Sequence, residues 1–286
     1  MANIVHISGN SMRKIGKMFA PTIITDKALA DVREVFHRWE FWVRLGAVEV
    51  RRRYRRTYVG PFWVSISMAI FIAATGIVYS LLFQQEIKQY IPFLASGMIA
   101  WTPISSIMTE SCVTFVSAEG ILKQIPLPYT VLIAASIWRN LIVFFHNFII
   151  YCLVVLLFDV PVNANTLLIV FGILSYAING MWIALLIAIV CARYRDIQPL
   201  LVSALQILMF VTPIFWPASM LEKNLLGKIC VWVNPFYHLT QVIRAPLLGE
   251  CPQWFVYVSV TLLAVFGWLF TLVLFSKVRQ RIIYWL

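Results

Sequence analysis

From Pro61 onward the chain is almost continuously apolar, with only short polar interruptions. Hydrophobic residues make up 61% of the 286 residues and charged residues 12%, which is too little charge to cover the surface of a water-soluble domain of this length. An apolar stretch of about 20 residues is long enough to cross the hydrocarbon layer of a membrane as a helix. The pattern therefore predicts an all-α, polytopic integral membrane protein.

The apolar region divides into six stretches that predict six transmembrane helices, at residues 62–83, 91–115, 131–158, 167–191, 200–216 and 254–275. The fifth is the shortest, and Pro213 and Pro217 bracket its end. We expect a cytoplasmic N-terminal segment at residues 1–60 and a single six-helix transmembrane domain at residues 61–286.

The basic residues are distributed unequally between alternate loops. Residues 1–60 carry 12 of the 23 Lys and Arg residues, and most of the others fall on the same side of the predicted membrane. The opposite side receives only Lys88, Lys223, Lys228 and Arg244. Because basic loops remain in the cytoplasm, both termini are predicted to be cytoplasmic. The net charge is +11, with half of the basic residues before the first span and most of the rest at cytoplasmic helix ends, which favours anionic membrane lipids over nucleic acid as partners.

The segment before the first span has two notable features. Residues 29–43 place Leu29, Val32, Phe36, Trp39 and Val43 at helical spacing, which predicts an amphipathic helix in the membrane interface. A soluble helix packed on another domain is the alternative. An arginine-rich run then leads to the first span: Arg51, Arg52, Arg53, Tyr54, Arg55 and Arg56. These cations either attract anionic lipid or only anchor the topology.

Ionisable and amide side chains inside predicted spans are informative, because each is costly in hydrocarbon unless it is paired or faces a polar cavity. Glu110 lies near the inner end of the second span. The third span has two adjacent polar stripes with a repeat of seven residues, formed by Arg139, Asn140, His146 and Asn147. Glu110 and Arg139 lie at similar depth, so we predict an interhelical ion pair, which either is structural or contacts a phosphate group of a substrate.

The predicted outer segment between Trp216 and Gln253 is too long for a hairpin and too apolar for a free loop. Residues 225–233 and 237–248 predict two short helices separated by Asn234 and Pro235. Cys230 and Cys251 both fall in this segment, where an oxidising compartment would permit a disulfide. Whether they are close enough to form one is left open.

Four sequence motifs together resemble one known family. They are the Arg53–Arg56 run followed by Gly60 and Trp63, the loop from Gly120 to Pro128, the Ala192–Asp196 turn, and Thr212–Trp216 followed by Asn234, Pro235 and Arg244. In this order, on a chain with six predicted spans, they resemble the permease subunits of polysaccharide-exporting ABC transporters. The resemblance covers the chain from about Trp39 to the C-terminus.

The resemblance implies a bacterial inner-membrane permease that exports a lipid-linked polysaccharide, with O-antigen as the first expectation and capsular polysaccharide or teichoic acid as alternatives. The permease would act as a homodimer with two separate ATPase subunits. The chain lacks the Gly-x-x-x-x-Gly-Lys-Ser/Thr phosphate loop, so it is not expected to be an enzyme or to hold a cofactor, and ATP and Mg²⁺ would bind to the partner subunit.

The resemblance also suggests roles for particular residues. The arginine-rich run would meet the lipid phosphate at the substrate entrance, and the polar residues of the second and third spans would be channel candidates. Contact with the ATPase is expected at Glu119, Gly120, Lys123, Pro126, Pro128, Arg193, Arg195 and Asp196. Re-entrant gate helices before the last span would involve Pro213, Trp216, Asn234, Pro235 and Arg244. Without the resemblance, a simple helix connection explains the first of these loops, a helix cap explains Asp196, and a surface cap explains the outer helices.

Two other classes of function remain open. An ion-coupled secondary transporter normally has an internal repeat or paired broken helices, and no repeat is visible in the sequence. A membrane enzyme acting on lipid-linked sugars needs clustered acids, bases or metal ligands. The four histidines are scattered through the chain, at His6, His37, His146 and His238.

Overall fold

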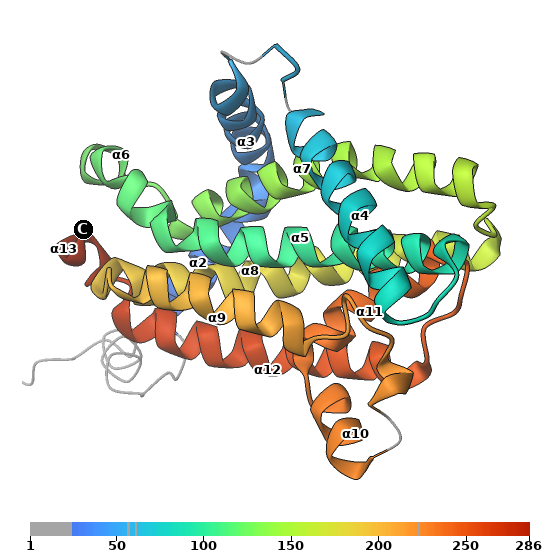
Figure 1. Ribbon diagram of the computed structural model, residues 1–286. Coiled ribbons are helices and arrows are strands. Elements are labelled where there is room, and N and C mark those ends of the chain that lie inside the picture. The colour runs from blue at the N-terminus through green and yellow to red at the C-terminus, as the bar shows by residue number, and fades with distance from the viewer. Residues whose placement is uncertain (1–24, 56–57, 61, 222–223) are drawn as a thin grey trace, which may run out of the picture.

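The computed structural model describes residues 25–55, 58–60, 62–221 and 224–286. Within these ranges all regular structure is helical (Figure 1). Four long helices run side by side: α5 (Ile87–Ser117), α7 (Tyr129–Phe158), α8 (Ile169–Arg193) and α12 (Trp254–Val278). The all-α prediction is thus confirmed for the described residues.

Among the described residues, five helices are long and apolar enough to cross a membrane, and they match five of the six predicted spans. They are α4 (Phe62–Leu82), α5, α7, α8 with the preceding 3₁₀ turn η1 (Ala164–Leu168), and α12. The remaining predicted span corresponds to α9 (Ile197–Val211), which is apolar but only 15 residues long. A sixth span therefore stays a prediction.

The core of the bundle is built around α5, which packs against α4, α7, α8, α9 and the short helix α11 (Pro235–Leu247). Tyr90, Ile99 and Ile107 on α5 are fully buried. Polar contacts join the helices as well: the Tyr176 hydroxyl on α8 donates a hydrogen bond of 3.1 Å to the Pro103 carbonyl on α5. Close packing and such hydrogen bonds hold helices together in a bilayer, where the hydrophobic effect between them is weak.

The prediction of one continuous amphipathic helix at residues 29–43 is wrong, because two helices cover this region. The chain forms α2 (Asp26–His37) and α3 (Trp39–Tyr54), with a break at Arg38. At the break, the Trp42 indole N–H donates to the Val35 carbonyl over 2.8 Å and so satisfies a group that a continuous helix would pair internally.

The apolar stripe predicted for this region is largely exposed, notably at Leu29, Phe36 and Trp39. The neighbouring side of α2, at Ala28, Asp31 and Val35, is buried. Both α2 and α3 pack on α7, and α2 also contacts α12. The helices therefore lie against the bundle and present an apolar face outward, as a helix in a membrane interface does.

Helix α3 crosses α7 steeply instead of running along it (Figure 1). The crossing point is at Gly46, where an added Cβ would lie 2.8 Å from the Ala135 carbonyl oxygen and 3.0 Å from Trp138. Only glycine permits so close an approach of the two backbones. This contact fixes the position of the arginine-rich end of α3 relative to the bundle.

An ion pair fastens α2 to the end of α12. The buried Asp31 carboxylate accepts two hydrogen bonds from the Arg279 guanidinium, at 2.7 and 2.9 Å. The Thr130 hydroxyl at the start of α7 donates to the Asp31 carbonyl over 2.5 Å. One residue thus links three segments that are distant in sequence.

We expect Asp31→Asn to loosen α2, because removing the carboxylate leaves Arg279 without its ion-pair partner. Breaking a largely buried pair costs about 3 kcal/mol, and less here because Arg279 is partly exposed. Limited trypsin digestion of the purified protein should cleave at Lys27 and Arg33 faster than in the wild type. Asp26→Asn, at an exposed position in the same helix, is the matched control and should leave the cleavage rate unchanged.

The two short helices predicted in the outer segment are confirmed as α10 (Leu225–Trp232) and α11. Helix α11 begins two residues earlier than predicted, because Asn234 caps it by accepting a hydrogen bond from the Phe236 N–H and Pro235 occupies its first position. Cys251 is exposed, and the side chain of Cys230 lies outside the described residues, so a disulfide between them stays a prediction.

Candidate functional site

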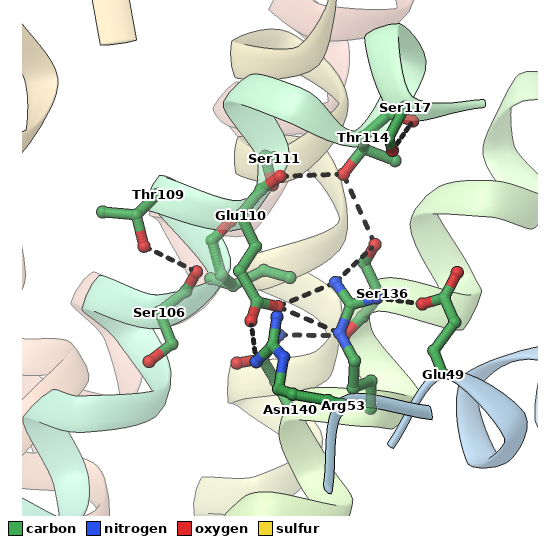
Figure 2. Close-up of polar contacts among 12 residues, drawn as sticks. Glu49, Arg53, Ser106, Thr109, Glu110, Ser111, Thr114, Ser117, Ser136 and Asn140 are labelled. Carbon is green, nitrogen blue, oxygen red and sulfur yellow. Dashed lines mark hydrogen bonds and ion pairs between the residues drawn. The ribbon is translucent and has the colours of Figure 1, made fainter. Parts of the chain in front are cut away.

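Four ionisable side chains from α3, α5 and α7 meet near the crossing of α3 and α7 (Figure 2). Arg139 on α7 donates to Glu110 on α5 over 2.8 Å, which confirms the predicted interhelical pair. Glu110 also accepts hydrogen bonds of 2.8 Å from Arg53 of α3 and from the Asn140 amide. Arg139 makes a second ion pair, with Glu49 of α3. We call Glu49, Arg53, Glu110 and Arg139 the ionic cluster.

The ionic cluster contains two positive and two negative groups, so its formal charge is zero. Both members of the central pair are mostly buried, with side-chain exposures of 12% for Arg139 and 17% for Glu110. Charges removed from water to this degree are tolerated only when their hydrogen-bonding groups are satisfied. The additional donors on Glu110 meet this condition, and they join α3, α5 and α7 into one unit.

Glu49 is the member of the ionic cluster that the sequence interpretation missed. Glu49 and Arg53 lie four residues apart on α3, so they share one face of that helix. This spacing was the available signal. It went unused because the amphipathic helix was expected to end at Val43, whereas α3 continues to Tyr54.

A cavity of about 470 Å³ lies beside the ionic cluster between α3, α5 and α7. Its polar lining includes Arg52, Arg53 and Arg139 together with the hydroxyl groups of Thr114 and Ser136. Glu49 and Glu110 also line it, so these charged groups sum to one positive charge. Apolar side chains complete the wall, namely Leu45, Val48, Val113, Ile121 and Leu132. The cavity thus places cations and hydroxyl groups next to an apolar surface.

The arginine-rich run is divided between different environments. Arg51, Arg52 and Arg53 form the last turn of α3, but of these only Arg52 and Arg53 line the cavity. Tyr54 is half-buried and Arg55 is exposed just after the helix. Arg56 lies outside the described residues. The predicted arginine cluster is therefore in part a component of the ionic cluster.

A second polar feature that the sequence interpretation missed is a stripe of hydroxyl groups on α5. Thr102, Ser105, Ser106 and Thr109 recur at helical spacing and are only partly buried, although α5 is the most buried of the five long helices. Thr102 donates to the Met98 carbonyl over 2.8 Å, and Thr109 donates to the Ser105 carbonyl over 3.0 Å. Satisfying these hydrogens within the helix leaves the hydroxyl oxygens free to accept hydrogen bonds. We call these four residues the hydroxyl stripe; it extends along α5 from Glu110.

The residues of the two polar stripes predicted on the third span contact different helices. Asn140 donates a hydrogen bond to Glu110 of the ionic cluster. Asn147 is buried about two turns further along α7 and accepts a hydrogen bond of 2.9 Å from Ser65 of α4. His146 bonds the Ile142 carbonyl within α7, and its ring packs edge-on against Phe62. These two residues therefore join α7 to α4 within this chain.

The residues predicted to contact an ATPase gather at one end of the bundle, near α6 (Glu119–Gln124), α13 (Ile282–Trp285) and the turn from α8 to α9 (Figure 1). Glu119 and Lys123 form an exposed ion pair of 2.6 Å, and the hydrogen bond from Lys123 lowers the pKa of the Glu119 carboxyl. Gly120 has open space around it, Pro126 is exposed and Pro128 directly precedes α7.

In the α8–α9 turn, Arg193 ends α8 and its guanidinium lies 5.2 Å from the ring centres of both Tyr194 and Trp285. Arg195 and Asp196 are exposed. Asp196 occupies the position before α9, but its side chain makes no capping hydrogen bond, so the cap proposed for it is wrong. Its backbone already has helical dihedral angles, which do not suit a side-chain cap.

The residues predicted for the outer gate surround an irregular segment after α9. Arg244 on α11 is buried, and its guanidinium donates to the carbonyls of Pro213 and Ile214 at 2.5 and 3.2 Å. It also lies 4.3 Å from the ring centre of Phe93. Asn234 donates to the Thr212 hydroxyl over 2.9 Å.

Two further contacts hold the same segment. The Tyr90 hydroxyl donates to the Phe215 carbonyl over 2.5 Å, and the Trp216 indole donates to the Phe210 carbonyl over 2.9 Å. Backbone that leaves helical geometry within a membrane protein needs such internal partners. The predicted gate residues therefore do come together, and they fix the exit of the chain from α9.

The bundle of long apolar helices has the architecture of a multi-pass membrane protein. Residues 42–248 match the family described as ABC-2 type transporter, and the chain belongs to this family. Membership implies a partner ATPase subunit and an inner-membrane location.

The sequence identity to individual relatives is low. The O-antigen export system permease protein RfbA of Myxococcus xanthus is 18% identical over 214 residues, which cover 75% of this chain and 82% of the relative. Two proteins of the same description from Klebsiella pneumoniae are 22% and 19% identical, covering 62% and 82% of this chain and 68% and 90% of the relatives.

Proposed function

We propose that this chain is the permease of an ATP-driven exporter that moves lipid-linked O-antigen from the cytoplasmic to the periplasmic side of the inner membrane. The observation that carries the proposal is the match to O-antigen export permeases over most of their length. The chain would act as a homodimer with two separate ATPase subunits, which would bind ATP and Mg²⁺. Both termini would be cytoplasmic, with α9 completing a sixth span and α10 and α11 re-entering the membrane from outside.

The lengths of α5 and α7 support a position for the ionic cluster. At 31 and 30 residues, these helices are about 45 Å long at 1.5 Å per residue, whereas the hydrocarbon layer is about 30 Å thick. Their inner ends would project beyond the hydrocarbon. Glu110 and Arg139, set back from those ends, would then lie at the depth of the lipid headgroups, where charged groups are tolerated.

The cavity beside the ionic cluster would receive the phosphate groups of the lipid carrier. Arg52 supplies an exposed cation next to an apolar wall suited to the lipid. From there the hydroxyl stripe on α5 offers acceptors to sugar hydroxyl groups without selecting one sugar sequence. Two copies of the chain would enclose this stripe between them.

Energy from the ATPase would reach the bundle through its inner end. Helix α6, the α8–α9 turn and α13 present charged and aromatic side chains there, and α6 is joined directly to α5 and α7. A push on α6 would therefore be transmitted to α5 and α7, two of the three helices that carry the ionic cluster. At the other end, the segment held by Arg244 would form the outer gate.

The direct test is reconstitution. The permease and the ATPase subunit from its gene neighbourhood should co-purify, and proteoliposomes containing both should take lipid-linked O-antigen across the bilayer only with ATP. Lipid-linked capsular polysaccharide and teichoic acid serve as competing substrates, and preferential transport of either would replace the O-antigen assignment. Transport by the permease alone, driven by an ion gradient, would contradict the ABC mechanism.

Arg52 and Arg51 provide a matched pair for testing the substrate entrance, because both are exposed in the last turn of α3 but only Arg52 lines the cavity. A cation near an anionic headgroup contributes about 1 kcal/mol, so Arg52→Ala should raise the apparent KM for the lipid-linked substrate about fivefold. Arg51→Ala should leave it close to the wild-type value. Equal effects of the two changes would point to a general surface charge instead of a site.

A further inference from the structure

The two oxygens of the Glu110 carboxylate have different partners (Figure 2). Oε2 accepts hydrogen bonds from the Arg139 guanidinium at 2.8 and 3.1 Å and from the Asn140 amide at 2.8 Å. Oε1 accepts a hydrogen bond of 2.8 Å from Arg53. If Arg53 moved away, Glu110 would therefore still be paired with Arg139 and hydrogen-bonded to Asn140.

Arg53 is also the more accessible of the two arginines that contact Glu110. Its side chain is 49% exposed and lines the cavity beside the ionic cluster, whereas the Arg139 side chain is 12% exposed. Arg139 is held by a second carboxylate as well, that of Glu49. An ion pair with a half-exposed member is weak, because water screens it. The Arg53–Glu110 contact is thus the one in the ionic cluster that a ligand can replace at the lowest cost.

The charges around the cavity show why a lipid phosphate would need Arg53. Glu110 and Glu49 are paired with Arg53 and Arg139, so Arg52 is the remaining cation among the described residues of the lining. A phosphate monoester carries about two negative charges near neutral pH. A second cation is required to balance it, and Arg53 is the paired arginine that is open to the cavity.

A phosphate group also suits the Arg53 side chain better than Glu110 does. The guanidinium group can donate two parallel hydrogen bonds to one phosphate, and charge-assisted bonds of this kind are strong. Towards Glu110, Arg53 donates one. A phosphate in the cavity can therefore compete with the carboxylate for this arginine.

We propose that Arg53 exchanges partners when the lipid-linked substrate binds: its guanidinium leaves Glu110 and, together with Arg52, binds the phosphate. Glu110 stays paired with Arg139. Glu110 is thus a positioning residue, which holds Arg53 at the empty cavity and limits the affinity for the phosphate, so that the lipid can leave again. The inference rests on the proposed function, because it takes this cavity as the site of the lipid phosphate.

The test measures the affinity of the full-length permease in nanodiscs for farnesyl phosphate, a lipid phosphate with one chain, against empty nanodiscs. Glu110→Gln removes the competing charge and should tighten binding about fivefold. Glu49→Gln is the matched control. It removes the same charge from the cavity lining but leaves the Arg53–Glu110 pair in place, so it should tighten binding by less than about twofold.

Arg53→Ala tests the exchange from the other side. Glu110 keeps its contacts with Arg139 and Asn140 in this variant, so the protein should fold, and binding should weaken about fivefold. In the Arg53→Ala background, Glu110→Gln should tighten binding no more than Glu49→Gln does, because two changes at one contact are not additive. Full tightening in the absence of Arg53, equal tightening by Glu110→Gln and Glu49→Gln, or unchanged binding by Arg53→Ala would overturn the proposal.

Two further ligands identify what the cavity recognises. Farnesol has the same chain without the charge, and its binding should not respond to Glu110→Gln. Inorganic phosphate cannot use the apolar wall, so it should displace farnesyl phosphate only at much higher concentration; displacement at equal concentration would overturn the proposal, because the site would then bind free anions. Binding of farnesyl phosphate that Glu110→Gln leaves unaltered would overturn the exchange alone, whereas the proposed function is contradicted by a lack of ATP-dependent export in proteoliposomes.

Discussion

Arg139→Leu is expected to destabilise the protein by about 3 kcal/mol, because it removes the partner of two partly buried carboxylates at once. Glu110 retains Arg53 and Asn140, whereas Glu49 loses its only described ion-pair partner. The result should be release of α3 from α5 and α7, seen as a lower midpoint of thermal unfolding in detergent. Arg44→Leu, at a strongly exposed ion pair on α3, should change the midpoint little.

A double variant separates structure from transport. In Glu49→Gln with Arg139→Leu, the carboxylate left without a partner becomes a neutral amide, while the Glu110–Arg53 pair persists. We expect this protein to recover part of the lost stability, by about 1 to 2 kcal/mol. If it is stable yet does not export, the ionic cluster takes part in transport; export at the wild-type rate would restrict Arg139 to a structural role.

The membrane helices were predictable from the sequence because the hydropathy pattern records the length of each apolar run. Long apolar runs with few charges specify membrane helices almost by themselves, so α4, α5, α7, α8 and α12 were predicted with small errors at their ends. The N-terminal region was predicted less well. The break at Arg38 depends on the Trp42 indole reaching the Val35 carbonyl, which is a contact in space that periodicity does not reveal.

Residues of the candidate site were predictable where burying their charge inside a membrane span would be energetically unfavourable without a partner. Glu110 and Arg139 were paired from sequence because each is unfavourable alone in a span. Glu49 lies outside the predicted spans, where a charged side chain is not costly, so nothing in the sequence indicated a partner for it. Its ion pair with Arg139 depends on how α3 crosses α7 at Gly46. The hydroxyl stripe was missed for a similar reason, because serine and threonine are common in membrane helices and satisfy their own hydrogens there.

The second large effect is expected at Arg244. Arg244→Met leaves the carbonyls of Pro213 and Ile214 without their donors, at a cost of about 1 to 3 kcal/mol each, although removing a buried charge offsets part of this. Arg244→Lys should recover little, because an ammonium group lacks the planar fork that reaches both carbonyls. Within residues 212–217, the backbone amides of Thr212, Ile214, Phe215 and Trp216 should exchange hydrogen for deuterium at least about tenfold faster, since a loss of 1.4 kcal/mol corresponds to that factor. Pro213 and Pro217 carry no amide hydrogen.

Gly97 allows the same contact to be broken without removing the arginine. A Cβ at this position would overlap the Arg244 guanidinium, which is held in place by its carbonyl partners and by Phe93. Gly97→Ala should therefore raise exchange at residues 212–217, whereas Gly120→Ala, where the surrounding space is open, should not. Because both changes act on one contact, Gly97→Ala combined with Arg244→Met should exceed the larger single effect only slightly. Full additivity would show that Gly97 acts independently of the contact between Arg244 and the carbonyls of Pro213 and Ile214.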